Sequence, residues 1–161
     1  MHELQALIGS ELSVAAVKQC WPVARSCELL HGLSIVPVDA VLCFQIVGFH
    51  FKFPDLEDDN VANNIKNHMR PLLDPLRRLA SALPLALVCT QYSGGVGNQM
   101  AALLSDNRCS GPFLGLDAIN QVLDHLGIRA DQQNERDAFS VVGLERWRTT
   151  EELTHEAGAN R

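Results

Sequence analysis

Long hydrophobic runs are missing from this chain. A helix that spans a bilayer needs roughly 18 or more consecutive apolar residues, and the longest apolar stretch here, residues 40–51, is interrupted by Gln45, Gly48 and His50. The first residues also lack a basic segment followed by an apolar one, which is the pattern of a secretory signal. We therefore expect a protein that does not bind a membrane and is not exported.

Paired cysteine motifs are absent as well. The five cysteines include no Cys-x-x-Cys pair, and Cys43 and Cys89 lie among apolar neighbours, as buried reduced thiols do. Cys20, Cys27 and His31 do not have the paired spacing by which a zinc site is recognised. The pattern predicts a cytoplasmic protein with no metal and no other cofactor.

Basic residues are fewer than acidic ones. The chain has 13 Lys and Arg against 19 Asp and Glu, which gives a formal net charge of −6. An acidic surface repels nucleic-acid phosphates, so we do not expect nucleic acid as a partner. Such a surface attracts basic proteins, although mild acidity also serves simply to keep a protein in solution.

Length and composition indicate one globular domain over residues 1–161. A chain of 161 residues with 47% apolar content buries a core without disulfides or a metal. Apolar periodicity predicts helices at residues 4–21, 61–83 and 117–126, and strands at residues 33–36, 41–53, 85–89 and 99–104. Together these elements predict an α+β fold, an antiparallel sheet with helices packed on one face.

Several details of this prediction are specific enough to check. Phe49, Phe51 and Phe53 alternate with polar residues, which predicts a strand with a buried aromatic face. Pro71 and Pro75 should kink the central helix or split it. Residues 154–161 should fray.

Three glycines follow the strand at residues 85–89. Gly94, Gly95 and Gly97 lie in the loop from Ser93 to Asn98, but no lysine follows them and the next predicted element is a strand. A phosphate loop needs both a lysine and a helix at that point. Glycines that allow a tight hairpin turn are the simpler interpretation. The alternative is a small nucleotide- or phosphate-binding enzyme domain that uses this loop.

No nucleophile and base form a recognisable pair. His50 and His125 each stand alone on the polar side of a predicted element, and a lone solvated histidine is not evidence of a catalytic triad. We therefore expect a protein that acts by binding and is not an enzyme.

One acidic segment precedes the central helix. Asp55, Glu57, Asp58 and Asp59 lie within five residues of one another. Aspartates at this position accept hydrogen bonds from the first N–H groups of a helix and suit its positive end. The alternative is an acidic patch that meets basic residues of a partner.

Two aromatic residues are candidate anchors for a partner. Tyr92 stands at the predicted hairpin turn, and Trp147 lies between Arg146 and Arg148. Trp and Arg are enriched among residues that dominate binding energy. Trp147 can equally pack on the core and fix the C-terminal part of the chain.

The second half of the chain carries a resemblance. Residues 92–99 read Tyr-Ser-Gly-Gly-Val-Gly-Asn-Gln, and Gly111-Pro112 follows them. A predicted helix at residues 118–128 contains the pair Ile-Asn. Residues 142–151 begin Val-Gly-Leu and end Arg-Thr-Thr-Glu. This series resembles small acidic immunity proteins that bacteria encode beside polymorphic toxins, including contact-dependent and type VI effectors.

The resemblance implies binding and neutralisation of a cognate protein toxin. The partner would be a basic, nuclease-like domain whose active site or docking surface is covered. The expected contacts are Asp55, Glu57, Asp58 and Asp59 as charge partners. Tyr92 and Trp147 are the expected anchors. Self-association as a homodimer through the aromatic strand is a further alternative.

Overall fold

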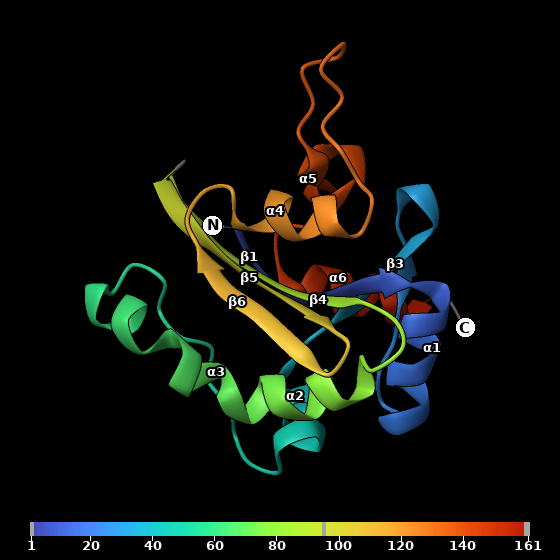
Figure 1. Cartoon of the computed structure of the whole chain (residues 1–161), viewed down its shortest axis with the longest axis vertical. Helices are drawn as coiled ribbons and strands as arrows, with labels where there is room; N and C mark the ends of the chain where they lie inside the picture. The colour runs from blue at the N-terminus through green and yellow to red at the C-terminus, as the bar shows by residue number, and fades with distance from the viewer. Residues whose placement is uncertain (1, 95, 160–161) are drawn as a thin grey trace.

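A six-stranded antiparallel sheet forms the centre of the computed structural model, which describes residues 2–94 and 96–159 (Figure 1). The strands lie in the order β2-β3-β1-β4-β5-β6. Their bounds are β1 His2–Ser10, β2 Cys27–Glu28, β3 Leu33–Pro37, β4 Leu85–Ser93, β5 Val96–Ser105 and β6 Arg108–Leu114. The predicted α+β class is confirmed.

Helices cover both faces of this sheet, not only one as predicted. On one side lie α1 (Glu11–Cys20), α2 (Ala40–Val47) and α3 (Asp59–Leu79), and on the other lie α4 (Ala118–His125), α5 (Ala138–Val141) and α6 (Thr150–Ala159). Figure 1 shows α4 and α5 above the sheet and α2 and α3 below it. Alternate side chains of a strand point to opposite faces, so Leu7 packs in the α3-side core while Leu4 and Ile8 pack in the α4-side core.

The first strand replaces the first half of a predicted helix. Leu4, Leu7 and Ile8 are all fully buried, and a short apolar run that is buried on both faces has no periodicity to separate it from a buried helix. The helix begins only after Ser10, whose hydroxyl accepts a hydrogen bond from the N–H of Ser13 at 3.2 Å. Ser10 is therefore both the last residue of β1 and the cap of α1.

The predicted strand at residues 41–53 is wrong. The carboxylate of Asp39 accepts from the N–H of Leu42 at 2.8 Å and starts α2, and Gly48, with φ of +81°, ends it. Phe49 and Phe53 follow in an irregular segment, the first 48% exposed and the second 8% exposed. The alternative of self-association through an aromatic strand required a strand in this segment, and the structure has a helix and an irregular segment there.

The middle of the chain follows the prediction more closely. Asp58 caps α3, with its carboxylate accepting from the N–H of Asn60 at 2.8 Å. The helix runs through Pro71 and Pro75 without splitting, because its buried face continues past both prolines. The buried residues of that stretch are Met69, Leu72, Leu73 and Leu76.

The predicted hairpin is confirmed and is longer than expected. It pairs Leu85 with Leu104 and Ser93 with Val96. The sequence did not predict β6, which returns through a turn at Asp106 and Asn107, with φ of +52° and +59°. Two successive positive φ values are the geometry of a tight hairpin turn.

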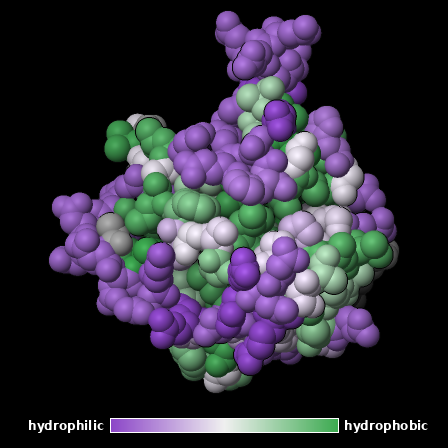
Figure 2. All heavy atoms as spheres, in the orientation of Figure 1, coloured by the Kyte–Doolittle hydropathy of each residue, from purple (hydrophilic) through white to green (hydrophobic). Residues whose placement is uncertain are grey.

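The C-terminal segment is ordered as helix α6, so the expectation of fraying is wrong for residues 154–159; residues 160 and 161 lie outside the described part. α4 is present as predicted, with Ile119, Val122 and Leu123 buried. Between α4 and α5 a loop projects from the body of the molecule, closed by a bridge between Asp131 and Arg136 (Figure 1). Figure 2 shows that this projection is hydrophilic.

Candidate partner-binding groove

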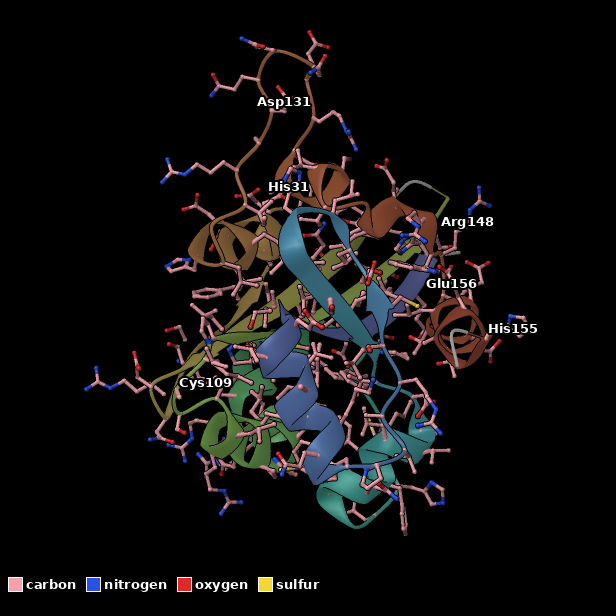
Figure 3. The ribbon with its side chains drawn as sticks, turned by 90° about the vertical axis from the view of Figure 1, so that its right-hand side faces the viewer. His31, Cys109, Asp131, Arg148, His155 and Glu156 are labelled. Carbon is pink, nitrogen blue, oxygen red and sulfur yellow. The ribbon has the colours of Figure 1, made fainter. Side chains whose placement is uncertain are left out.

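Two adjoining hollows lie beside the first half of β1. The first, of about 540 Å³, lies between the start of β1, the end of β4 and the segment that follows α2. The second, of about 460 Å³, lies between α2 and α6. Gln5, Asp39 and Ala40 line both hollows, so we treat them as one surface and call it the acidic groove. In Figure 3, α6, which carries His155, lies above α2 at the right-hand side.

The charge of this groove is strongly negative. Its lining residues include the five carboxylates of Glu3, Asp39, Asp55, Glu57 and Glu151, and among the described lining residues the one Lys or Arg is Lys52. With the histidines neutral, five carboxylates against one ammonium give a formal charge of −4, whereas the whole chain has −6. The groove thus carries a formal −4 of the chain's −6, and a concave surface that is mainly of one sign focuses the field that attracts a cation.

The segment that carries Asp55 is held in place by the hairpin. The side-chain amide of Gln91 donates to the carbonyl of Pro54 at 3.0 Å and accepts from the N–H of Leu56 at 2.7 Å. The side chain of Asn98 donates to the carbonyl of Leu56 at 3.0 Å. Since three hydrogen bonds fix the backbone on either side of Asp55, this backbone has little conformational entropy left to lose on binding.

The C-terminal segment brings further acidic residues to the same place. The N–H of Glu3 donates to the carbonyl of Arg148 at 2.7 Å, and the N–H of Gln5 donates to the hydroxyl of Thr150 at 2.9 Å. These bonds continue the sheet beside the first half of β1, where β3 does not reach. They place Glu151, which follows Thr150 at the start of α6, on the rim of the groove.

Burial disfavours the charged form of one histidine in the groove, His2. The Nδ1 atom of His2 lies 2.7 Å from the hydroxyl oxygen of Thr90, which also accepts from the N–H of Leu4 at 3.0 Å. Burial lowers the pKa of His2 below its ordinary value of 6.5. The neutral form of the ring is therefore favoured at neutral pH.

The cysteine in the groove wall is not a nucleophile. Cys43 is 2% exposed, and burial, with a smaller contribution from the Asp39 carboxylate, raises the pKa of its thiol to about 12. The thiolate is the reactive form, so this sulfur is inert at neutral pH. Within residues 2–94 and 96–159, no three His, Cys, Asp or Glu side chains come together in a way that could hold a metal ion.

Three of the predicted contact residues line the groove. Asp55, Glu57 and Tyr92 all do so, and Tyr92 is half-buried, with its ring edge-on to His2 at a centroid separation of 6.2 Å. Asp58 and Asp59 are exposed at the start of α3 and are not among the lining residues. The acidic segment thus serves two purposes: its first half faces the groove and its second half caps a helix.

Trp147 lies in the core. Only 2% of it is exposed, and its indole N–H donates to the carboxylate of Glu156 at 2.7 Å. The guanidinium of Arg146 lies 4.6 Å from the ring centroid and also bonds Glu156, at 2.7 Å. Figure 3 labels Glu156 on α6. The ring is not accessible to a partner, so the expectation that Trp147 anchors one is wrong. Its bond to Glu156 on α6 instead agrees with the alternative, in which Trp147 packs on the core and fixes the C-terminal part of the chain.

Sequence reasoning did not identify three of the groove's acidic residues. Asp39 precedes an apolar run and could have been recognised as a helix cap. Glu3 and Glu151 carry no local signal, because their place in the groove depends on pairing between segments almost 150 residues apart along the chain.

The glycine-rich turn does not form a phosphate site in the residues described. Ser93 pairs with Val96, and β5 begins at Val96 directly after the turn, so a strand stands where a phosphate loop has a helix. Gly95 lies outside the described residues. Gly97 has a different reason to be glycine: an added Cβ would lie 1.9 Å from the carbonyl oxygen of Gln91.

Comparisons of the chain with protein-family models, with curated proteins and with solved structures found no match. In the part of the chain that is described, no helix has the length and apolar character needed to cross a membrane. What the fold and the site define is thus an α+β domain with a preformed acidic groove.

Proposed function

We propose that this protein binds a basic protein through its acidic groove and thereby inhibits it, as an immunity protein does with a toxin in the cytoplasm of the cell that makes both. The observation that carries the proposal is the concentration of charge, −4 of a net −6, in one groove. Toxins that act on nucleic acid need basic surfaces to hold phosphates. An acidic groove competes for those same basic residues.

The rigid presentation of the groove supports binding over catalysis. The hydrogen bonds from Gln91 and Asn98 hold the Asp55 segment in one conformation. Preorganised charges raise association rates and reduce the entropy lost on binding. The thiol of Cys43 is buried and burial disfavours the charged form of His2, so a cation-binding surface accounts for the groove better than a reactive centre.

If the proposal is right, a neighbouring gene encodes a basic toxin domain, and the direct test mixes that domain with this protein. We expect a complex whose affinity falls as NaCl rises from about 50 mM to about 300 mM, because exposed charges are screened over that range. The variant Glu57→Lys should slow association by on the order of tenfold, because it reverses a charge in the groove.

A matched control is Asp124→Lys, which makes the same charge change on α4, none of whose residues lines the groove. Asp124 is exposed and its pair with Arg129, at 3.6 Å, is a surface pair of little value to stability. Equal association rates for Glu57→Lys and Asp124→Lys would show that the groove is not the binding site. No complex at micromolar concentration would refute the proposed partner.

A further inference from the structure

An exposed apolar patch adjoins the acidic groove. Val41 and Phe44 on α2 are 59% and 48% exposed, and Phe49 after α2 is 48% exposed. The ring centroids of His50 and Phe44 lie 5.8 Å apart, so the segment after α2 folds back beside the helix. We call Val41, Phe44 and Phe49 the α2 patch.

The patch and the groove form one continuous surface. Ala40, which lines both hollows, lies one helical turn before Phe44, and residues four apart share a helix face. The carboxylate of Asp39, at the N-terminus of the same helix, is in the groove. A molecule that rests on Phe44 therefore extends directly to the carboxylates.

The patch is not required by the core of the fold. The inward face of α2 is already formed by Leu42, Cys43 and Ile46, all buried. Phe44 and Phe49 are the phenylalanines with the greatest exposure in the described chain, and aromatic rings left in water beside a charged cleft are typical of interaction sites.

We infer that the α2 patch and the acidic groove together bind a basic amphipathic helix of the partner protein. The apolar face of that helix packs on Val41, Phe44 and Phe49, and its lysines or arginines enter the groove. The charge of the groove selects a cationic occupant. An exposed helical ridge such as the one at Ala40 and Phe44 can pack into the groove of a second helix, and binding through the apolar face of an amphipathic helix is a recurring mode of recognition. This inference rests on the proposed function and specifies its partner.

The test uses three synthetic peptides of about 18 residues, or about five helical turns. The first is a Lys/Leu peptide with all leucines on one helical face. The second has the same composition with the leucines dispersed around the helix. The third is a Lys/Ser peptide of equal charge. We expect the first to bind at least about fivefold more tightly than either of the others, because only it satisfies both surfaces.

Variants separate the two surfaces. Phe44→Ser should weaken the amphipathic peptide about fivefold or more and change the Lys/Ser peptide less than about twofold. Leu12→Ser is the matched control, since Leu12 is 68% exposed on α1 and away from the groove. Glu57→Gln should weaken all three peptides. Circular dichroism checks that each variant is folded.

The outcomes distinguish the inference from the function on which it rests. Equal binding of the three peptides, or a Phe44→Ser variant that binds like the wild type, would overturn the amphipathic helix and leave the basic partner in place. If Glu57→Gln leaves the affinity for all three peptides unchanged, both the amphipathic-helix inference and the proposed binding of a basic protein by the groove are overturned. If the wild type is a dimer by sedimentation and Phe44→Ser is a monomer, the patch is an interface between two copies and the inference is wrong.

Discussion

The side-chain oxygen of Gln91 accepts a hydrogen bond from the backbone N–H of Leu56 at 2.7 Å. This bond joins the end of β4 to the segment that carries Asp55, and the amide nitrogen of the same side chain secures Pro54. The orientation of the amide is fixed, because a carbonyl can only accept and an N–H can only donate. The shape of the acidic groove therefore depends on a side chain that is not itself charged.

Replacing Gln91 should loosen the groove before it unfolds the protein. In Gln91→Ala the N–H of Leu56 and the carbonyl of Pro54 both lose their hydrogen bond to this side chain. We expect a loss of about 1–3 kcal/mol in unfolding free energy, together with faster hydrogen exchange at the amide of Leu56. Gln45→Ala is the control, because Gln45 is an exposed glutamine on α2. An unchanged exchange rate at Leu56 would show that Gln91 does not hold the segment.

Two glycine substitutions should act in opposite directions. Gly97→Ala places a Cβ 1.9 Å from the carbonyl oxygen of Gln91 and 2.6 Å from the Cα of Tyr92, so the backbone of the hairpin must shift. We expect a loss of about 3 kcal/mol, at the upper end of what overpacking usually costs.

Gly158→Ala is the counterpart within α6. An added Cβ there meets no atom within 4 Å, and alanine is favoured over glycine in a helix by up to about 1 kcal/mol. Urea denaturation of both variants measures the two changes. A stabilised Gly97→Ala would contradict the pairing of β4 with β5 at that position.

Acid should weaken the protein through His2. Burial lowers the pKa of this histidine in the folded state below 6.5. In acid, His2 therefore takes up a proton more readily in the unfolded chain than in the folded protein, which favours unfolding. The contribution of His2 to stability is present above pH 6.5 and is lost as the pH falls through the pKa of the folded state.

The comparison that isolates this effect is His2→Gln. Urea denaturation at about pH 7.5 and about pH 5.5 should show a greater loss of unfolding free energy for the wild type than for the variant. Equal losses would show that His2 is solvated and not packed against Thr90.

The cysteines should differ widely in reactivity. Cys20 is exposed, Cys109 is partly buried, and Cys27, Cys43 and Cys89 are buried. Burial raises the pKa of the thiols of Cys43, Cys89 and Cys109. With a thiol reagent at neutral pH we expect one fast reaction, at Cys20, which Cys20→Ser removes. Fast modification of Cys43 would mean that the groove wall opens in solution.

The parts of the fold that sequence reasoning recovered are those with strong local signals. The β4–β5 hairpin was found because an apolar run, a glycine turn and a second apolar run follow one another. α4 was found because Ile119, Val122 and Leu123 repeat at helical spacing. The acidic segment at residues 55–59 was recognised as a helix start because a capping carboxylate acts on its own neighbours, and the structure identifies Asp58 as the capping residue.

The parts that it missed depend on tertiary contacts. Leu4, Leu7 and Ile8 fit a helix or a doubly buried strand equally well, and only the pairing of β1 with β3 and β4 decides between them. The alternation of Phe49, Phe51 and Phe53 resembled a strand, but the segment is irregular and its rings do not share one buried face. Phe49 is exposed, whereas the rings of Phe51 and Phe53 pack edge-on with their centroids 5.4 Å apart.

The candidate site divides in the same way. Asp55, Glu57 and Tyr92 were proposed from sequence and do line one groove. Glu3, Asp39 and Glu151 join them from elements whose neighbours are set by the sheet and by the bond between Glu3 and Arg148. For Trp147 the sequence left two interpretations open, because composition alone cannot say which aromatic residues are buried, and its burial favours the one in which it fixes the C-terminal part of the chain.

The most direct measurement is a titration of ¹⁵N-labelled protein with the Lys/Ser peptide, followed by amide chemical shifts. If the groove is the cation-binding surface, the largest changes fall at Glu3, Asp39, Asp55, Glu57 and Glu151, and they diminish with added salt. Changes spread evenly over the acidic residues, or centred on α4 and the projecting loop at Asp131, would contradict the account.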